Sequence, residues 1–263
     1  MSDSPDRSLT SRLFGWARRQ DQSADGGRAA GPPVGTKVLT KLIGALATRE
    51  APVVLDLGPV VGSNVSYLGE QLGCRLRVED LFSDIDRLTR EQRFETMAEF
   101  LEQRFSYEPE SVDAVLCWDV LDYLEKPAAT VLASRVVEWI KPGGVALCFF
   151  NMVTSPTPVY TRYVITDTEH LQYRTSPAAH PRRTVYQNRD IDRLFNGLYV
   201  SDSFLLQHKV REVLLRKKAA PANAERRTGN AEPEAPNAER GTPNEPREAK
   251  AAGRPTKANH DRS

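Results

Sequence analysis

Short strand-like runs alternate with helical segments through the middle of this chain, and this alternation limits its fold more than any other feature. Four runs, VVLDLG, CRLRVED, VDAVLCW and VALCFF, begin at residues 53, 74, 112 and 145. The first three are followed by segments whose apolar residues recur at helical spacing. Strands that alternate with helices form parallel sheets with right-handed crossovers. The sequence therefore predicts an α/β fold with a doubly wound, mostly parallel sheet.

The last third of the chain has a different pattern. Residues 160–173 are rich in β-branched and aromatic side chains and contain the turn sequence TDTE, which predicts a hairpin inserted after the VALCFF run. Farther on, Asn188 can cap a short helix that Gly197 ends. The runs YVSDSFLLQ and REVLLRK then predict an antiparallel pair of strands at the end of the sheet.

Apolar residues are absent from the end of the chain and scarce at its start. From Ala219 to Ser263 there is no Val, Ile, Leu, Phe, Trp, Tyr, Met or Cys, so we expect residues 219–263 to form a disordered low-complexity tail. Residues 1–35 are expected to be disordered as well, apart from a short basic amphipathic helix at residues 8–20 that could contact a membrane surface or a protein groove. One folded domain is expected over residues 36–218.

Charge and cysteine content exclude several classes of protein. The formal net charge is +1, whereas binding to a nucleic-acid backbone requires a concentrated positive surface, so we expect no nucleic-acid partner. Cys74, Cys117 and Cys148 lie in or beside apolar runs without metal-site or disulfide spacing, and are expected to be buried thiols in a reducing compartment. No apolar stretch has the length of a membrane span, and the start lacks the apolar core of a signal peptide. We therefore expect a cytoplasmic protein without a metal site.

The loop DLGPVVGSN, which begins at Asp56, is the first place to look for a ligand, because ligands bind beyond the carboxyl ends of strands in open α/β sheets. A dinucleotide fingerprint begun at Gly58 needs glycines at the positions held by Val60 and Ser63, which disfavours an NAD-dependent oxidoreductase. The pattern DxGxGxG begun at Asp56 is met at Gly58 and Gly62 and missed at Val60. No GKS or GKT follows, which excludes a P-loop.

Four segments resemble class I S-adenosylmethionine-dependent methyltransferases, in the family's order. Residues 53–81 are similar to the family's first strand, glycine loop, helix and second strand. SVDAVLCWDVLDYLEKP, from residue 111, is similar to the segment around its fourth strand, and WIKPGGVALCFF, from residue 139, to its turn and fifth strand. The closing helix and hairpin agree with the family's sixth strand and its antiparallel seventh strand, so the resemblance extends over about residues 52–218. It implies a Rossmann-like methyltransferase fold with a seven-stranded sheet that ends in an antiparallel hairpin.

The resemblance also implies S-adenosylmethionine as the cofactor and indicates where it would bind. The family has an acid at the end of the second strand that holds the ribose hydroxyls, and Glu79 or its neighbour Asp80 stands there. Asp119 follows the fourth strand and could line the pocket or equally cap the next helix. The expected cofactor-binding residues are Asp56, Gly58, Pro59, Gly62, Glu79, Asp80, Trp118 and Asp119.

Two departures from the family's pattern leave a second function open. Val60 replaces the middle glycine, and a positive φ at this residue would cost about 1–2 kcal/mol. Residues 88–105 lack the strand and acid that contact the adenine, and have a helical pattern instead. Aromatic or apolar side chains could rebuild that pocket, namely Phe94, Met97 or Phe105.

Polar side chains after the fifth strand are candidates for acceptor binding. Asn151, Tyr160 and Tyr163 stand there, and a Tyr could orient an acceptor or remove its proton. A role in the hairpin surface or core is the alternative. The run that begins at Arg182 could bind an anionic substrate or form a solvated basic face.

The sequence thus predicts methyl transfer from S-adenosylmethionine to a small-molecule acceptor. The sulfonium is already activated and the protein supplies mainly proximity and orientation, so no catalytic residue is named. The alternative is a methyltransferase-like module that binds a ligand or a partner without catalysis.

Overall fold

The computed structural model describes residues 31–219. The expected basic helix at residues 8–20 and the expected tail beyond Ala219 lie outside the described residues. No helix in the described part of the chain is long and apolar enough to cross a membrane.

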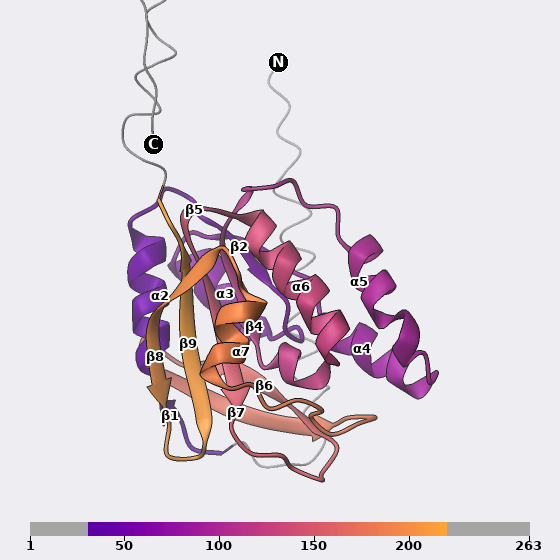
Figure 1. Cartoon of the computed structure of the whole chain (residues 1–263). Coiled ribbons are helices and arrows are strands. Elements are labelled where there is room, and N and C mark those ends of the chain that lie inside the picture. The colour runs from indigo at the N-terminus through magenta and orange to yellow at the C-terminus, as the bar shows by residue number, and fades with distance from the viewer. Residues whose placement is uncertain (1–30, 220–263) are drawn as a thin grey trace, which may run out of the picture. The chain divides into compact units, whose positions relative to one another are not determined.

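The main sheet has the order β3-β2-β4-β5-β9-β8 (Figure 1). The strands β3 (Arg75–Val78), β2 (Val53–Asp56), β4 (Val112–Trp118) and β5 (Ile140–Asn151) are parallel, whereas β9 (Val210–Lys217) is antiparallel to both β5 and β8 (Leu198–Leu205). The predicted α/β fold with a terminal antiparallel pair is confirmed. The chain leaves β2 toward β3 on one side and reaches β4 on the other, which makes the carboxyl end of β2 a topological switch point.

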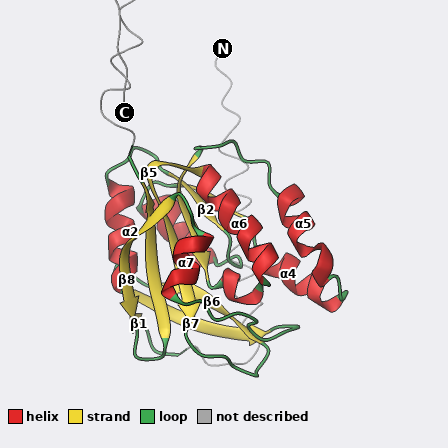
Figure 2. Ribbon diagram, in the orientation of Figure 1, coloured by secondary structure: helices red, strands yellow, loops and turns green. Residues whose placement is uncertain are grey.

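Helices cover both faces of this sheet (Figure 2). One face packs against α2 (Lys37–Ala47), α3 (Gly62–Ser66) and the π-helical turn η1 (Tyr67–Gln71). The other packs against α4 (Leu81–Arg90), α5 (Met97–Arg104), α6 (Lys126–Trp139) and α7 (Asn188–Leu194), with the 3₁₀ turns η2 (Phe94–Thr96) and η3 (Val120–Tyr123) between them. Because the central strands are buried on both faces, every residue of β4 is buried, as its continuous apolar run predicts.

The expectation of seven strands in this sheet is wrong, because the described residues form six. In the part of the sequence where the family has the strand and acid that contact the adenine, residues 97–104 form helix α5 instead. Met97 and Leu101 are the buried residues of this helix, and a spacing of four places them on one face of it. The helical pattern read at residues 88–105 is therefore confirmed.

A second sheet contains the predicted hairpin. Strands β6 (Val159–Ile165) and β7 (His170–Pro177) pair antiparallel, and the short strand β1 (Val34–Gly35) pairs with β7. In Figure 1, β6 and β7 cross the end of the main sheet at which its parallel strands finish. The hairpin therefore lies over the edge where a ligand is expected.

Two smaller expectations have different outcomes. Cys74, Cys117 and Cys148 are buried and free, as expected. Helix α7 is capped by Gln187 in a capping box with Asp190, so Asn188 is its first residue and not its cap.

Candidate functional site

Asp56 ends β2 at the switch point, and its carboxylate is almost fully buried. One carboxylate oxygen accepts hydrogen bonds from the Gly58 amide at 2.9 Å and from the Trp118 indole Nε1 at 2.7 Å. Burial raises the pKa of Asp56 to about 6, and the negative charge of nearby Asp80 contributes to the rise. The end of β2 thus carries a desolvated acid joined to the end of β4.

The indole of Trp118 lies so close to Gly58 that it leaves no space for a side chain there. A Cβ at this position would stand 2.5 Å from the indole Cδ1 of Trp118, closer than any real contact. Neither Gly58, Val60 nor Gly62 has a positive φ, so the backbone strain considered for Val60 does not arise. Pro59 and Val60 are half-buried, and Gly62 begins α3.

Trp118 has an unusual backbone conformation. Its φ of 48° lies in the left-handed region, which a bulky residue adopts at a cost of about 1–3 kcal/mol. The indole is 3% exposed. It stacks on Tyr163 with ring centroids 5.3 Å apart, and meets the edge of Phe149 at 5.6 Å. The indole therefore fills the space between the glycine loop and the hairpin.

The two acids after β3 face different surroundings. The Glu79 carboxylate accepts a hydrogen bond from Arg104 at 2.9 Å and one from the Tyr107 hydroxyl, so it is turned toward α5. Asp80 has a φ of 39° and caps α4 by accepting from Ser83 N at 3.2 Å. Burial raises the pKa of Asp80. The Glu79 amide donates to the Asp56 carbonyl at 2.8 Å, but of the two acids it is the carboxylate of Asp80 whose charge acts on Asp56.

Asp119 forms a buried ion pair with Arg182. Its carboxylate accepts from the guanidinium at 3.0 Å, and the same nitrogen of Arg182 donates to the Thr161 hydroxyl at 3.1 Å. Only 14% of the Arg182 side chain is exposed. Burial acts to raise the pKa of Asp119, and the charge of Arg182 opposes this effect. Arg182 is thus part of the site and not of a solvated basic face.

Asn151 is turned into the core. Its backbone N and its Nδ2 both donate to one oxygen of Asp122 at 2.8 Å. The other oxygen of Asp122 is buried with no partner among the described residues. Burial and the charge of Asp119 hold the pKa of Asp122 well above its usual range. Sequence reasoning missed Asp122, although the family-like segment VLDYL contains it.

The two candidate tyrosines differ in their environments. Tyr160 stacks on Phe82 of α4 at 4.1 Å, and its hydroxyl accepts from Arg162 at 2.9 Å. Tyr163 is buried under Trp118. Asn64 of α3 holds the backbone at Tyr163, because its Nδ2 donates to the Tyr163 carbonyl at 2.8 Å. No pattern in the sequence indicated this role of Asn64.

Residues 178–187, here called the strap, cross the same edge of the sheet. At one end Ala179 N donates to Asp86 of α4 at 2.5 Å, and at the other the Thr184 hydroxyl donates to the Leu124 carbonyl at 2.9 Å. Between them, the guanidinium of Arg183 lies 4.2 Å from the centre of the Phe94 ring. Met97 and Phe105 belong to the core beneath. The residues considered for an adenine pocket are thus covered by the strap or by the core.

Acids outnumber cations in this site. Four carboxyl groups, of Asp56, Asp80, Asp119 and Asp122, have raised pKa values, and the guanidinium groups that act on them belong to Arg162 and Arg182. A buried excess of acid favours a cationic ligand. The described residues contain no cluster suited to a metal ion. The charge of the site fits a cation, while the space beside Gly58 is filled by the indole.

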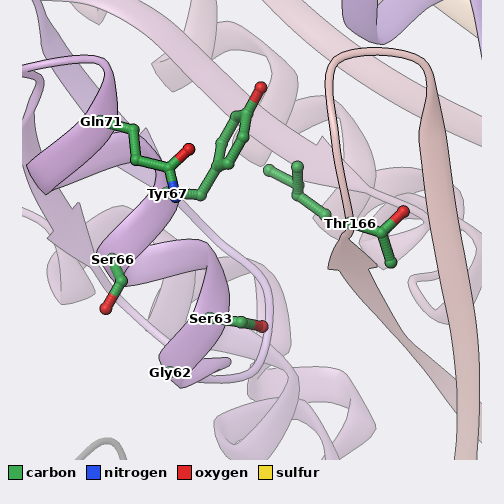
Figure 3. A pocket seen from close by; sticks show the side chains of 7 residues that line it. Gly62, Ser63, Ser66, Tyr67, Gln71 and Thr166 are labelled. Carbon is green, nitrogen blue, oxygen red and sulfur yellow. The ribbon is translucent and has the colours of Figure 1, made fainter.

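Two cavities flank the site. One, of about 420 Å³, lies between α4 and the hairpin and is lined by Phe82, Ser83, Asp86, Arg87, Arg90, Glu91, Tyr160 and Pro177. The other, of about 380 Å³, lies between α3 with η1 and the end of β6; Figure 3 shows its mostly hydroxyl and amide lining, made of Gly62, Ser63, Ser66, Tyr67, Gln71, Ile165 and Thr166. Neither is lined by Asp56 or Gly58.

Comparison with known proteins gives a family match and similar folds. A family model described as a methyltransferase domain matches residues 33–198. No curated protein matches the chain. The chain is similar to the 1,6-didemethyltoxoflavin-N1-methyltransferase of Burkholderia thailandensis at 13% identity and a TM-score of 0.43, over 83% of this chain and 92% of that one. It is also similar to an S-adenosylmethionine-dependent methyltransferase from Clostridium acetobutylicum at 15% identity and a TM-score of 0.39, over 80% of this chain and 100% of that one.

Proposed function

This chain belongs to the class I S-adenosylmethionine-dependent methyltransferase family, and on that premise we propose that it transfers the methyl group of this cofactor to a small-molecule acceptor. The observation that carries the proposal is the buried Asp56 against Gly58 at the switch point of the sheet. A ligand at this edge meets the ends of β2, β3 and β4 together. The acid excess of the site supports a donor of positive charge.

The residues of the chain supply binding and orientation in this proposal. S-adenosylmethionine carries positive sulfonium and ammonium groups and one carboxylate, and when bound it supplies a methyl group already activated for transfer. Asp56 and Asp80 would attract its positive charge and accept hydrogen bonds from its hydroxyls. The backbone of the loop from Gly58 to Gly62 would lie against the bound cofactor. The hairpin and the strap would exclude water from the bound donor, which strengthens electrostatic attraction within the site. Holding the two reactants in place then lowers the barrier.

The cavity between α4 and the hairpin supports an acceptor of small size. It is an open hollow of about 420 Å³, a volume within the range of small-ligand pockets. Phe82 and Tyr160 form one wall as a stacked pair, which suits a planar or apolar group. The hairpin and the strap lie over the sheet edge at Asp119, so a folded protein or a nucleic-acid duplex would be kept from it.

Calorimetric titration with S-adenosylmethionine and S-adenosylhomocysteine tests the donor site. We expect Asp80→Asn to weaken binding of S-adenosylmethionine by about tenfold, since a lost charge contact is worth on the order of 1.4 kcal/mol, and Glu79→Gln to leave it nearly unchanged. Equal losses of affinity in the two variants would show that the donor does not bind beside Asp80 in preference to Glu79. Transfer of a labelled methyl group to small aromatic and heterocyclic acceptors, followed by mass spectrometry, tests the acceptor class.

A second function is favoured by one observation. The indole of Trp118 fills the space beside Gly58, as expected of a module that keeps the fold and binds a ligand or partner without catalysis. Failure of the wild type and of a Trp118→Gly variant to bind either cofactor form, with both proteins folded, would support this function over methyl transfer.

The proposal extends to location. Three buried free thiols support a reducing compartment, and we propose the cytoplasm, with no nucleic-acid partner. Cell fractionation of the full chain tests this location.

A further inference from the structure

We propose that the indole of Trp118 is an internal occupant of the donor site and that the methyl donor binds by displacing it. The inference rests on the proposed function, because it concerns the regulation of the same site. It makes Trp118 the residue that controls access of the donor to the end of β2.

The contacts of the indole are those that a ligand of this loop would make. Its N–H donates to the buried Asp56 carboxylate at 2.7 Å, and its Cδ1 lies where a Cβ on Gly58 would collide. A glycine in a ligand loop lets the ligand approach the backbone closely. Here the close approach is made by the chain's own side chain.

The backbone at Trp118 supports movement of this side chain. Its φ is 48°, and the pairing of β4 with β5 shifts register between Leu116 and Trp118. Register shifts at strand ends re-aim side chains, and left-handed conformations of bulky residues occur where a site or a switch requires them. The strained backbone at the end of β4 therefore marks Trp118 as the residue at which such a switch would act.

Trp139 shows what a purely structural tryptophan looks like in this chain. Its side chain is 1% exposed and packs edge-on against Phe105 and Tyr107, and its φ is not positive. Trp118 differs from it because it touches a glycine loop, a buried acid and the hairpin. The hairpin and the strap together are here called the roof of the site.

Movement of the indole is coupled to that roof. Trp118 stacks on Tyr163 of the hairpin, whose backbone Asn64 anchors to α3. The next residue, Asp119, is paired with Arg182 of the strap. Displacement of the indole therefore loosens the hairpin and the strap together, and donor entry and opening of the roof become one event.

Calorimetric titration with S-adenosylmethionine on the full chain tests the proposal. We expect Trp118→Ala to bind at least tenfold more tightly than the wild type, because no indole has to be displaced. Phe149→Leu is the matched control, since it removes a neighbour on another side of the indole without clearing the space beside Gly58, and we expect its affinity to equal that of the wild type. Circular dichroism confirms that each variant is folded.

Tryptophan emission gives a readout that is independent of activity. We expect S-adenosylmethionine to shift the emission of the wild type to longer wavelength as the indole leaves its buried stack, and Trp118→Phe to abolish this shift. Wild-type binding with no emission change and no gain in Trp118→Ala would overturn the inference and leave the proposed function standing. Equal gains in Trp118→Ala and Phe149→Leu would also overturn it, because they would indicate general loosening. No binding by the wild type, Trp118→Ala or Trp118→Gly would overturn the proposed function itself, and the inference with it.

Discussion

The guanidinium of Arg182 and the carboxylate of Asp119 meet at 3.0 Å across 63 positions of the chain. Their pairing joins the strap to the end of β4, and both side chains are largely buried. A charge buried in this way is tolerated only while its partner is present. The closed roof of the site therefore depends on a contact between two segments that no local pattern connects.

Removal of Arg182 should destabilise the fold. We expect Arg182→Met to lower the free energy of unfolding by about 3 kcal/mol, because it leaves Asp119 buried without a counter-charge. Urea unfolding at pH 7 measures this loss. Arg90→Met is the control, since the Arg90 side chain is 62% exposed and ion pairs of such exposed side chains contribute at most about 1 kcal/mol. Similar losses in the two variants would mean that the Arg182 pair contributes no more than a surface pair.

Asn64 should determine the attachment of the hairpin. We expect Asn64→Ala to cost about 3 kcal/mol, because it leaves the Tyr163 carbonyl and the Ile165 N–H buried without partners. Amide hydrogen exchange should accelerate in residues 159–177 more than in β4. Uniform acceleration across both sheets would show that Asn64 stabilises the whole domain rather than the hairpin.

Gly58 should tolerate no side chain while Trp118 is in place. We expect Gly58→Ala to destabilise the protein by about 1–3 kcal/mol through overpacking against the indole. Gly44→Ala is the control, because among the described residues no atom other than those of its chain neighbours and of its own helix backbone lies within 4 Å of the Cβ position at Gly44. In a helix this change should stabilise by about 0.5–1 kcal/mol. Thermal unfolding measures both.

The effect of Gly58→Ala should be smaller in a Trp118→Ala background. The two residues are in contact, and the effects of substitutions at neighbouring sites are not additive. Strict additivity of the double variant would indicate that the cost at Gly58 arises from the backbone alone.

Asp56 should make stability fall as the pH rises toward neutrality. Its pKa is about 6 in the folded chain against 3.8 for a free group, so between these values the folded state binds more protons than the unfolded state, and unfolding becomes easier as the pH rises. The groups that face Asp56 are the indole N–H of Trp118, the Gly58 amide and the acid Asp80. The shift corresponds to about 3 kcal/mol at most, at about 1.4 kcal/mol for each pKa unit.

Urea unfolding between pH 4 and pH 7 tests this dependence. We expect Asp56→Asn to reduce the fall in stability over this range, because an amide does not titrate. The acids Asp80, Asp119 and Asp122 also have raised pKa values, so a part of the fall should persist. An unchanged pH profile would place the pKa of Asp56 near its ordinary value.

The order of elements and the edge of the site were predictable from the sequence by itself. Apolar runs too short for helices predicted β2, β4 and β5, and alternation with helices predicted that their carboxyl ends share one edge. Asp56, Gly58, Trp118 and Asp119 stand at those ends in the sequence, so their meeting follows from the topology. The helical pattern of residues 88–105 predicted the helix that lies where the seventh strand was expected.

Only the tertiary structure decided which side chains face one another at that edge. The left-handed backbone at Asp80 and Trp118 turns Asp80 beside Asp56 and the indole onto Gly58, and apolar periodicity carries no information about such single dihedral angles. Arg182 and Asn64 reach their partners from 63 and 99 positions away. Contacts of this kind depend on how the hairpin and the strap fold back over the sheet, and that path is determined by packing between layers rather than by any local pattern of residues.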